Sequence, residues 1–270
     1  MTEQLQYQLK SIRLSGMAQN LPIRIQEAKA NDLPYQTFLE NLIEDELSRR
    51  RESLLNRRLK QAKFPYLRTM DEFDFQFNPS LDKRLIKEVA SCAFIARNEN
   101  VLLLGPPGVG KSHLAISFGT QAIHNGFSVL YRSIFDMAED FAKQPEMDMV
   151  GRYVKPHVLI LDELGMKLLS SQYTEVLLEV IHRRYQRSST IIATNRPIED
   201  WGMILGDHAA VSAILDRFLE GVHFIKITGR SYRLRKLKPD GHNLIKKERN
   251  DNVKELKPEK IEKNMKNERK

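Results

Sequence analysis

One eight-residue segment has the composition and setting of a phosphate-binding loop. It follows the apolar run 101–104 and reads Gly105, Pro106, Pro107, Gly108, Val109, Gly110, Lys111 and Ser112. Its glycines let backbone N–H groups turn toward phosphate oxygens, and the N-terminus of the helix expected after it adds positive charge. Lys111 can reach the β and γ phosphates, and the Ser112 hydroxyl can bind Mg²⁺. The segment predicts a P-loop that binds ATP and Mg²⁺, with His113 as the last residue of the site.

A second apolar run ends in two acids. Residues 158–163 read Val-Leu-Ile-Leu-Asp-Glu, which is typical of a parallel strand that is buried on both faces. At the carboxyl end of such a strand, Asp162 would lie beside the P-loop and hold Mg²⁺ through water, and Glu163 would polarise the attacking water. Two acids also occur simply where a strand leaves the core. Downstream of a P-loop, however, they predict a Walker B strand.

Three polar residues further along could complete an ATPase site. Asn195 ends a β-rich run and could hold the lytic water, which resembles sensor 1 of the AAA+ ATPases. Arg217 lies on a predicted helix before the last strand, so that it could reach a neighbouring subunit's nucleotide as an arginine finger. Arg233 follows that strand and looks like sensor 2. The alternative for Arg217 is a surface ion pair with Asp216 or Glu220.

The elements that position these residues alternate between strands and helices from residue 79 to about residue 237. Strands are predicted at 101–104, 128–131, 158–161, 190–194 and 222–227, and helices at 81–96, 112–124, 134–143, 172–187 and around 213–218. Such alternation predicts an α/β fold in which helices cover both faces of a parallel sheet. We expect this ATPase domain to span residues 79–237.

Residues 1–65 have no Gly-rich or strand-like stretch, and we predict that they form a small helical domain for DNA binding and oligomerisation. Apolar residues recur at helical spacing from Leu39 to Leu47, and the helix is expected to continue toward Pro65. Basic residues on this helix can neutralise the phosphates of duplex DNA, although such a run can also be only a solvated helix face. They are Arg49, Arg50, Arg51, Arg57, Arg58, Lys60 and Lys63.

Composition limits the function classes. The chain has 270 residues, of which 41% are hydrophobic, enough for one α/β core with a small appendage. Its net charge of +8 favours an acidic partner. The single cysteine, Cys92, is predicted to be a buried thiol, which excludes a disulfide framework and fits the reducing cytoplasm of a bacterium. No apolar run approaches the roughly 18 residues that span a bilayer.

Residues 238–270 are predicted to be a disordered basic tail that attracts DNA or only improves solubility.

The order of these motifs resembles the IstB family of transposition helper ATPases, which are relatives of the DnaC-type helicase loaders. The resemblance covers about residues 5–237 and rests on the motifs at 14–17, 46–50, 73–75, 162–165, 183–185, 215–217 and 231–233. Three residues depart from the family pattern: Ser112 stands where Thr is common, Met166 where an aromatic is usual, and Arg196 beside the predicted sensor 1. None of these departures removes a catalytic group.

This resemblance implies an AAA+ ATPase that assembles as a homo-oligomer on double-stranded DNA and assists a DDE-type transposase similar to IstA. It also implies that residues 66–78 form a linker over the adenine end of the nucleotide site, although ordinary packing on the core is an alternative. Two other functions remain open: a loader of a replicative helicase, and a nucleotide-gated DNA clamp with little turnover. The Arg-rich helix and the few aromatic residues before residue 65 favour transposition over loading, and Glu163 and Asn195 argue against the clamp.

Overall fold

The computed structural model describes residues 2–143, 146–166, 170–205 and 208–235. The chain divides into two compact units, residues 1–229 and 230–270, and we describe each by itself. The helices of the first unit are α1 (Thr2–Ser11), α2 (Ser15–Ala30), α3 (Tyr35–Ala62), α4 (Lys83–Ala90), α5 (Ala93–Ala96), α6 (Lys111–His124), α7 (Ile134–Lys143), α8 (Glu146–Val154), α9 (Ser171–Arg184), α10 (Trp201–Leu205) and α11 (His208–Leu219), with the 3-10 helix η1 (Ile198–Asp200). Of the second unit, the structure describes the 3-10 helix η2 (Tyr232–Leu234), whereas the predicted tail lies outside the described residues.

A parallel sheet of five strands lies at the centre of the first unit. Its strands are β1 (Val101–Leu104), β2 (Val129–Ser133), β3 (Val158–Leu164), β4 (Ser189–Thr194) and β5 (His223–Lys226). The strand order is β2-β3-β4-β1-β5, and every neighbouring pair is parallel. Parallel neighbours need crossover connections, which the helices supply. The predicted fold class is therefore confirmed, with β1, the strand before the P-loop, between β4 and β5.

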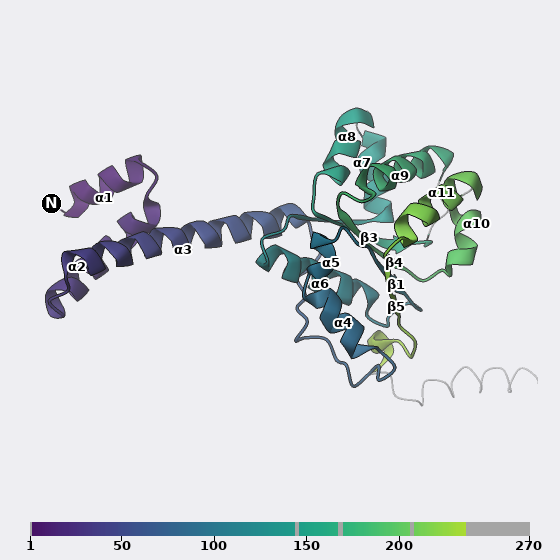
Figure 1. Ribbon diagram of the computed structural model, residues 1–270, viewed down its shortest axis with the longest axis horizontal. Coiled ribbons are helices and arrows are strands. Elements are labelled where there is room, and N and C mark those ends of the chain that lie inside the picture. The colour runs from purple at the N-terminus through teal and green to yellow at the C-terminus, as the bar shows by residue number, and fades with distance from the viewer. Residues whose placement is uncertain (1, 144–145, 167–169, 206–207, 236–270) are drawn as a thin grey trace, which may run out of the picture. The chain divides into compact units, whose positions relative to one another are not determined.

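Each face of the sheet is covered by its own set of helices (Figure 1). Side chains on a strand alternate between the two faces, so Val101 and Leu103 of β1 belong to one core and Leu102 to the other. The first core includes residues of α4, α5, α6 and the end of α3. The second core includes residues of α7, α8, α9, α10 and α11. β1, β2, β3 and β4 thus contribute to both cores, as their nearly continuous apolar runs predicted, whereas the edge strand β5 contributes only Ile225, to the first core.

Three helices, α1 to α3, account for the regular structure of residues 2–62. Met17, Leu21 and Leu42 form a small core between α2 and α3. The two helices approach closely at Gly16, whose N–H donates to the buried Glu46 carboxylate over 2.7 Å. A Cβ on Gly16 would lie 2.8 Å from backbone atoms of α3, so only glycine allows this approach. At its other end α3 joins the first sheet core through Ala62.

The predicted elements differ from the observed ones at a few ends. The helix expected over 81–96 is two helices, α4 and α5, because the backbone at Cys92 takes a positive φ of 64° between them. Cys92 itself is buried, as predicted, and burial raises the pKa of its thiol. The helix expected to end at residue 187 ends at Arg184 instead. Helix α8 was not predicted at all.

The early end of α9 places one arginine inside the protein. Arg184 is buried, and its guanidinium donates to the carbonyl oxygens of Tyr153 and Pro156, each over 2.9 Å. It also donates to the Ser189 carbonyl and the Thr190 hydroxyl at the start of β4. None of its partners among the described residues is a carboxylate. Burial lowers the pKa of Arg184 to about 9, so the side chain is still protonated at neutral pH and joins α8, α9 and β4 as a cation.

We expect Arg184→Met to lower the free energy of unfolding by about 3 kcal/mol or more, because several buried carbonyls lose their donor and each unsatisfied group costs about 1–3 kcal/mol. The matched control is Arg183→Met. Its side chain is exposed and pairs only with Glu179 one turn earlier, so its cost should stay within about 0.5 kcal/mol. Urea denaturation measures both. Equal losses in the two variants would contradict the central role of Arg184.

Candidate functional site

The P-loop begins where three strands come together. The N–H of Gly105 donates to the Thr194 carbonyl of β4 over 3.2 Å. On the other side, a Cβ on Gly105 would lie 2.2 Å from the Ile227 carbonyl oxygen, a distance that no side chain tolerates. The N–H of Ile227 in turn donates to the Leu104 carbonyl over 2.7 Å. Glycine at this position therefore lets the chain leave β1 between β4 and β5.

The loop itself has the backbone that phosphate binding requires. Gly108 and Gly110 take φ values of 81° and 104°, which glycine adopts without strain. Val109 between them is buried, and its carbonyl accepts from Asn78 over 3.1 Å. The Lys111 ammonium donates to the Pro106 carbonyl over 2.9 Å, so it lies across the loop. The loop is thus closed on itself and tied down by the segment before α4.

The N-terminus of α6 opens at this loop. Gly110 is its N-cap and offers no side chain to the first N–H groups of the helix, and a helix N-terminus of this kind attracts an anion. A Cβ on Gly110 would lie 2.7 Å from the Phe73 ring, so this cradle also excludes a side chain. The ammonium of Lys111, the Ser112 hydroxyl and these N–H groups fit a nucleotide's phosphates.

The first acid of the Walker B strand is held firmly. Asp162 is buried, and one of its carboxylate oxygens accepts from the Tyr131 hydroxyl over 2.9 Å. Its other oxygen accepts from the Glu163 N–H over 2.8 Å. Burial and the Asp162 charge both raise the pKa of Tyr131, so its hydroxyl remains a donor. Tyr131 was missed from the sequence, because only the register of β2 against β3 brings it to Asp162.

The second acid leaves the strand by a bulge. Glu163 has a positive φ of 62°, and the register between β3 and β4 shifts between Leu161 and Leu164. The Thr194 hydroxyl donates to the Leu164 carbonyl over 2.7 Å and secures the far side of the bulge. A bulge redirects the side chain that it contains, and here Glu163 is exposed while Asp162 stays buried. The two adjacent acids therefore have different surroundings, which suits different roles.

Asn195 follows β4 and is the next residue after the Thr194 that binds Gly105. Its side-chain N–H₂ donates to the Met166 sulfur over 3.3 Å. Its side-chain oxygen is buried and has no hydrogen-bond partner among the described residues, which is unusual for a buried polar atom. An acceptor without a donor beside the P-loop fits a bound water. Met166, one of the departures from the family pattern, here orients that amide.

Residues 66–78 pack on the start of α6. Phe73 meets His113 edge to face at 5.3 Å between ring centroids, and Phe75 meets Phe73 at 4.9 Å. The His113 ring shares a hydrogen bond of 3.1 Å with the Thr69 carbonyl. Burial lowers the pKa of His113, so the ring is neutral at pH 7. This segment does lie against the P-loop, and its contact with adenine stays a prediction.

The predicted arginine finger lies at the other edge of the sheet. Arg217 lines a cavity of about 310 Å³ with Asn100, which precedes β1, and Gln186, which precedes β4. The P-loop and Asn195 follow those same strands, so they lie at the opposite, carboxyl edge. Arg217 donates to the Ala213 carbonyl of its own helix over 2.9 Å, and it forms no ion pair with a described acid. Arg233 lies exposed in η2 of the second unit, and its sensor role stays a prediction.

The seven basic residues predicted to contact DNA fall into three groups. Arg50 pairs with Glu46 over 2.6 Å, Arg51 pairs with Glu44 over 2.9 Å, and Arg49 donates to Gln19. These partners come from the preceding turns of α3 and from α2. Lys63 has a left-handed backbone after the end of α3, and Arg132 and Arg152 lower its pKa. The remaining three have no acidic partner among the described residues: Arg57, Arg58 and Lys60.

Fold and site together define a P-loop ATP-binding protein of the AAA+ type. The family profile described as "IstB-like ATP binding protein" matches residues 7–239, and the chain belongs to this family. It is 34% identical over 242 residues to an IS21 insertion-sequence protein of Pseudomonas aeruginosa named for ATP binding, covering 88% of this chain and 91% of that protein. It is 35% identical over 239 residues to the corresponding IS5376 protein of Geobacillus stearothermophilus, covering 87% and 95%.

Solved structures support the fold. A replication initiator DnaA bound to AMPPCP and single-stranded DNA aligns with a TM-score of 0.50 at 18% identity, covering 66% of this chain and 58% of that one. At this identity the likeness shows the fold alone. In the described part of the chain, no helix has both the length and the apolar character that crossing a membrane would need.

We expect Lys111→Ala to weaken ATP binding by about ten- to a hundred-fold, because a charge-assisted contact with a polyanion is worth about 1.5–3 kcal/mol. Titration with a fluorescent ATP analogue measures the dissociation constant. Lys87→Ala on α4 removes the same charge away from the loop and serves as the control. Unchanged affinity in Lys111→Ala would exclude this residue from the phosphate site.

Proposed function

We propose that this protein hydrolyses ATP, assembles as a homo-oligomer on duplex DNA, and assists an IstA-like DDE transposase. The relatives named above belong to insertion sequences, which supports the transposition context. The observation that carries the proposal is the separation of Arg217 from the P-loop by the length of the sheet. In this geometry Arg217 cannot reach the phosphates of its own subunit, so it would act on the nucleotide of a neighbour.

Hydrolysis would proceed by direct attack of water on the γ phosphate, which gives ADP and inorganic phosphate. Glu163 polarises the water, and Asn195 holds it in line through the oxygen that is otherwise unpaired. Lys111 and the N–H groups at the start of α6 stabilise negative charge on the transferred group. Ser112 and the buried Asp162 would hold Mg²⁺, which neutralises charge on the β and γ phosphates when bound. Tyr131 keeps the Asp162 carboxylate in place for this task.

The contact with DNA is proposed for the basic side of α3. Arg57, Arg58 and Lys60 have no acidic partner among the described residues and are therefore the strongest candidates on this helix. Arg49 and Arg51 are exposed and bridge to Gln19 and Glu44, so they would exchange these partners for phosphates. Contacts of this type neutralise phosphates without reading bases. They fit a protein that assembles on many sequences.

We expect Glu163→Gln to retain ATP binding while turnover falls at least about a hundred-fold, because the amide keeps the shape of the side chain but cannot polarise water. ATP-dependent complexes on DNA should then last longer than those of the unaltered protein. Phosphate release and dissociation from an immobilised duplex measure the two effects. Glu175→Gln on the exposed side of α9 is the control. Normal hydrolysis in Glu163→Gln would assign water activation to another group.

We expect Arg217→Ala to bind ATP normally and to hydrolyse it slowly, because the residue acts on the next subunit. Mixing Arg217→Ala with Lys111→Ala subunits should restore part of the activity, at interfaces where an intact arginine meets an intact P-loop. Arg217→Lys should restore little, since a lysine lacks the planar fork of the guanidinium. Steady-state rates across a range of mixing ratios provide the measurement. Strictly additive rates without rescue would rule out a shared site.

A further inference from the structure

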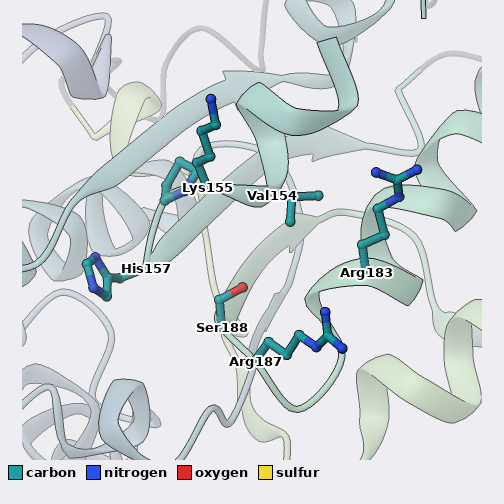
Figure 2. A pocket seen from close by; sticks show the side chains of 7 residues that line it. Val154, Lys155, His157, Arg183, Arg187 and Ser188 are labelled. Atoms are coloured by element: carbon teal, nitrogen blue, oxygen red, sulfur yellow. The ribbon is translucent and has the colours of Figure 1, made fainter. Parts of the chain in front are cut away.

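A second cavity lies at the amino edge of the sheet, away from the P-loop. It has a volume of about 380 Å³ and sits beside the starts of β3 and β4. Its lining comes from the end of α8 and the loop before β3, and from the end of α9 and the turn after it (Figure 2). The lining residues are Val154, Lys155, Pro156, His157, Arg183, Arg187 and Ser188. Neither the proposed ATPase chemistry nor the proposed α3 contact uses any of them.

The charged side chains of this cavity are all basic. Lys155 and Arg187 are exposed, and neither has an acidic partner within 4.0 Å among the described residues. Arg183 is paired with Glu179, so it adds less to the local charge. Two cations from two different segments thus remain at the rim, where opposite charge would be attracted.

The layer beneath the cavity is also cationic. The buried Arg184 donates to the carbonyls of Val154 and Pro156, which are themselves lining residues. Its guanidinium lacks a carboxylate partner among the described residues, and a buried charge without a counter-ion is costly. An anion in the cavity would offset part of this cost, because only one layer of backbone would separate it from the Arg184 guanidinium. The lowered pKa of Arg184 agrees with such an uncompensated charge.

One hydrogen-bonding group in the cavity is unused. The Ser188 hydroxyl oxygen is buried and has no partner among the described residues. In Figure 2 this hydroxyl points into the space that the basic side chains border. The carbonyl of Arg184 already accepts from the N–H groups of Arg187 and Ser188, so the end of α9 does not need the hydroxyl. The hydroxyl is covered from solvent in this conformation, so Ser188 could donate to an anion that Lys155 and Arg187 attract only after its side chain rotates.

We propose that this cavity binds a phosphate group of the DNA backbone. The inference rests on the proposed DNA-binding function, and it adds a contact on the ATPase core to the contact on α3. A protein partner is the less suitable occupant, because interface hot spots are built around large apolar or aromatic anchors and the only apolar lining residues are Val154 and Pro156. The chain's charge of +8 also favours a polyanion.

The test uses the full chain with ATP and a duplex of about 30 base pairs. Each phosphate that is neutralised contributes about −0.9 to the slope of log affinity against log salt. Lys155→Ala with Arg187→Ala removes this one phosphate contact, so it should flatten the slope by about 0.9 per engaged subunit and leave ATP binding unchanged. Fluorescence anisotropy from 50 to 200 mM salt, a range typical for such titrations, gives the slopes. An unchanged slope in this double variant would overturn the proposal.

Two controls separate the possible causes. Arg84→Ala with Lys87→Ala changes the net charge equally on the exposed side of α4, and its slope should match that of the unaltered protein. If this control flattened the salt slope equally, the effect would come from net charge alone, and the proposal that the cavity is a binding site would be overturned. A melting temperature reports whether Lys155 and Arg187 instead only stabilise the end of α9. A lower melting temperature with an unchanged slope would mean that they do.

Two further outcomes identify the source of failure. If the unaltered protein does not bind the duplex at all, the proposed function fails and takes this inference with it. If it binds normally and the cavity variant binds in the same way, the proposed function stands and the inference alone fails.

A glutamate-rich peptide of equal charge is the remaining competitor. Displacement of duplex by this peptide from the unaltered protein, but not from the cavity variant, would assign the cavity to carboxylates and overturn the DNA assignment.

Discussion

The close approach of three strands at Gly105 is the constraint on which the rest of the site depends. The Thr194 carbonyl accepts the Gly105 N–H on one side, and the Ile227 carbonyl on the other leaves no room for a side chain. The same contact ties β4 to the P-loop, so the residue after Thr194, Asn195, necessarily emerges beside the phosphate cradle. Backbone packing thereby sets the position of a polar side chain ninety residues away in sequence, without any direct contact between side chains.

Much of this site could be predicted because its chemistry is local in sequence. The glycines around Lys111 and the acids that end β3 are read from neighbouring residues, and the buried strands appear as apolar runs. The order of these runs was enough to predict the parallel sheet and its helical covering. It was not enough to predict which strands pair and in which register, because register depends on contacts between distant segments. Tyr131 therefore escaped notice, although it holds the carboxylate that was correctly singled out.

Other features could not be predicted because long-range contacts override local preference. Arg184 lies in a run of basic residues that reads as a surface helix end, yet carbonyls from α8 and β4 bring it inside. The same limit applies to α3, where Glu46 is buried by Gly16 of α2 and binds Arg50. A charge pattern on one helix does not reveal which charges a second helix will neutralise. Nor does it reveal that a positive φ at Cys92 divides one helical pattern into two helices.

The placement of Arg217 and the P-loop at opposite edges of one sheet also restricts the symmetry of any assembly that shares a site. A two-fold dimer could share a site only if both edges of each subunit lay in one self-complementary interface, and such an assembly would close at two subunits. Subunits that instead associate head to tail form either a closed ring or an open helix. In an open helix the first P-loop has no neighbouring arginine, and the last arginine has no nucleotide to serve. Growth and hydrolysis would then differ between the two ends, so the filament would have a direction along its DNA.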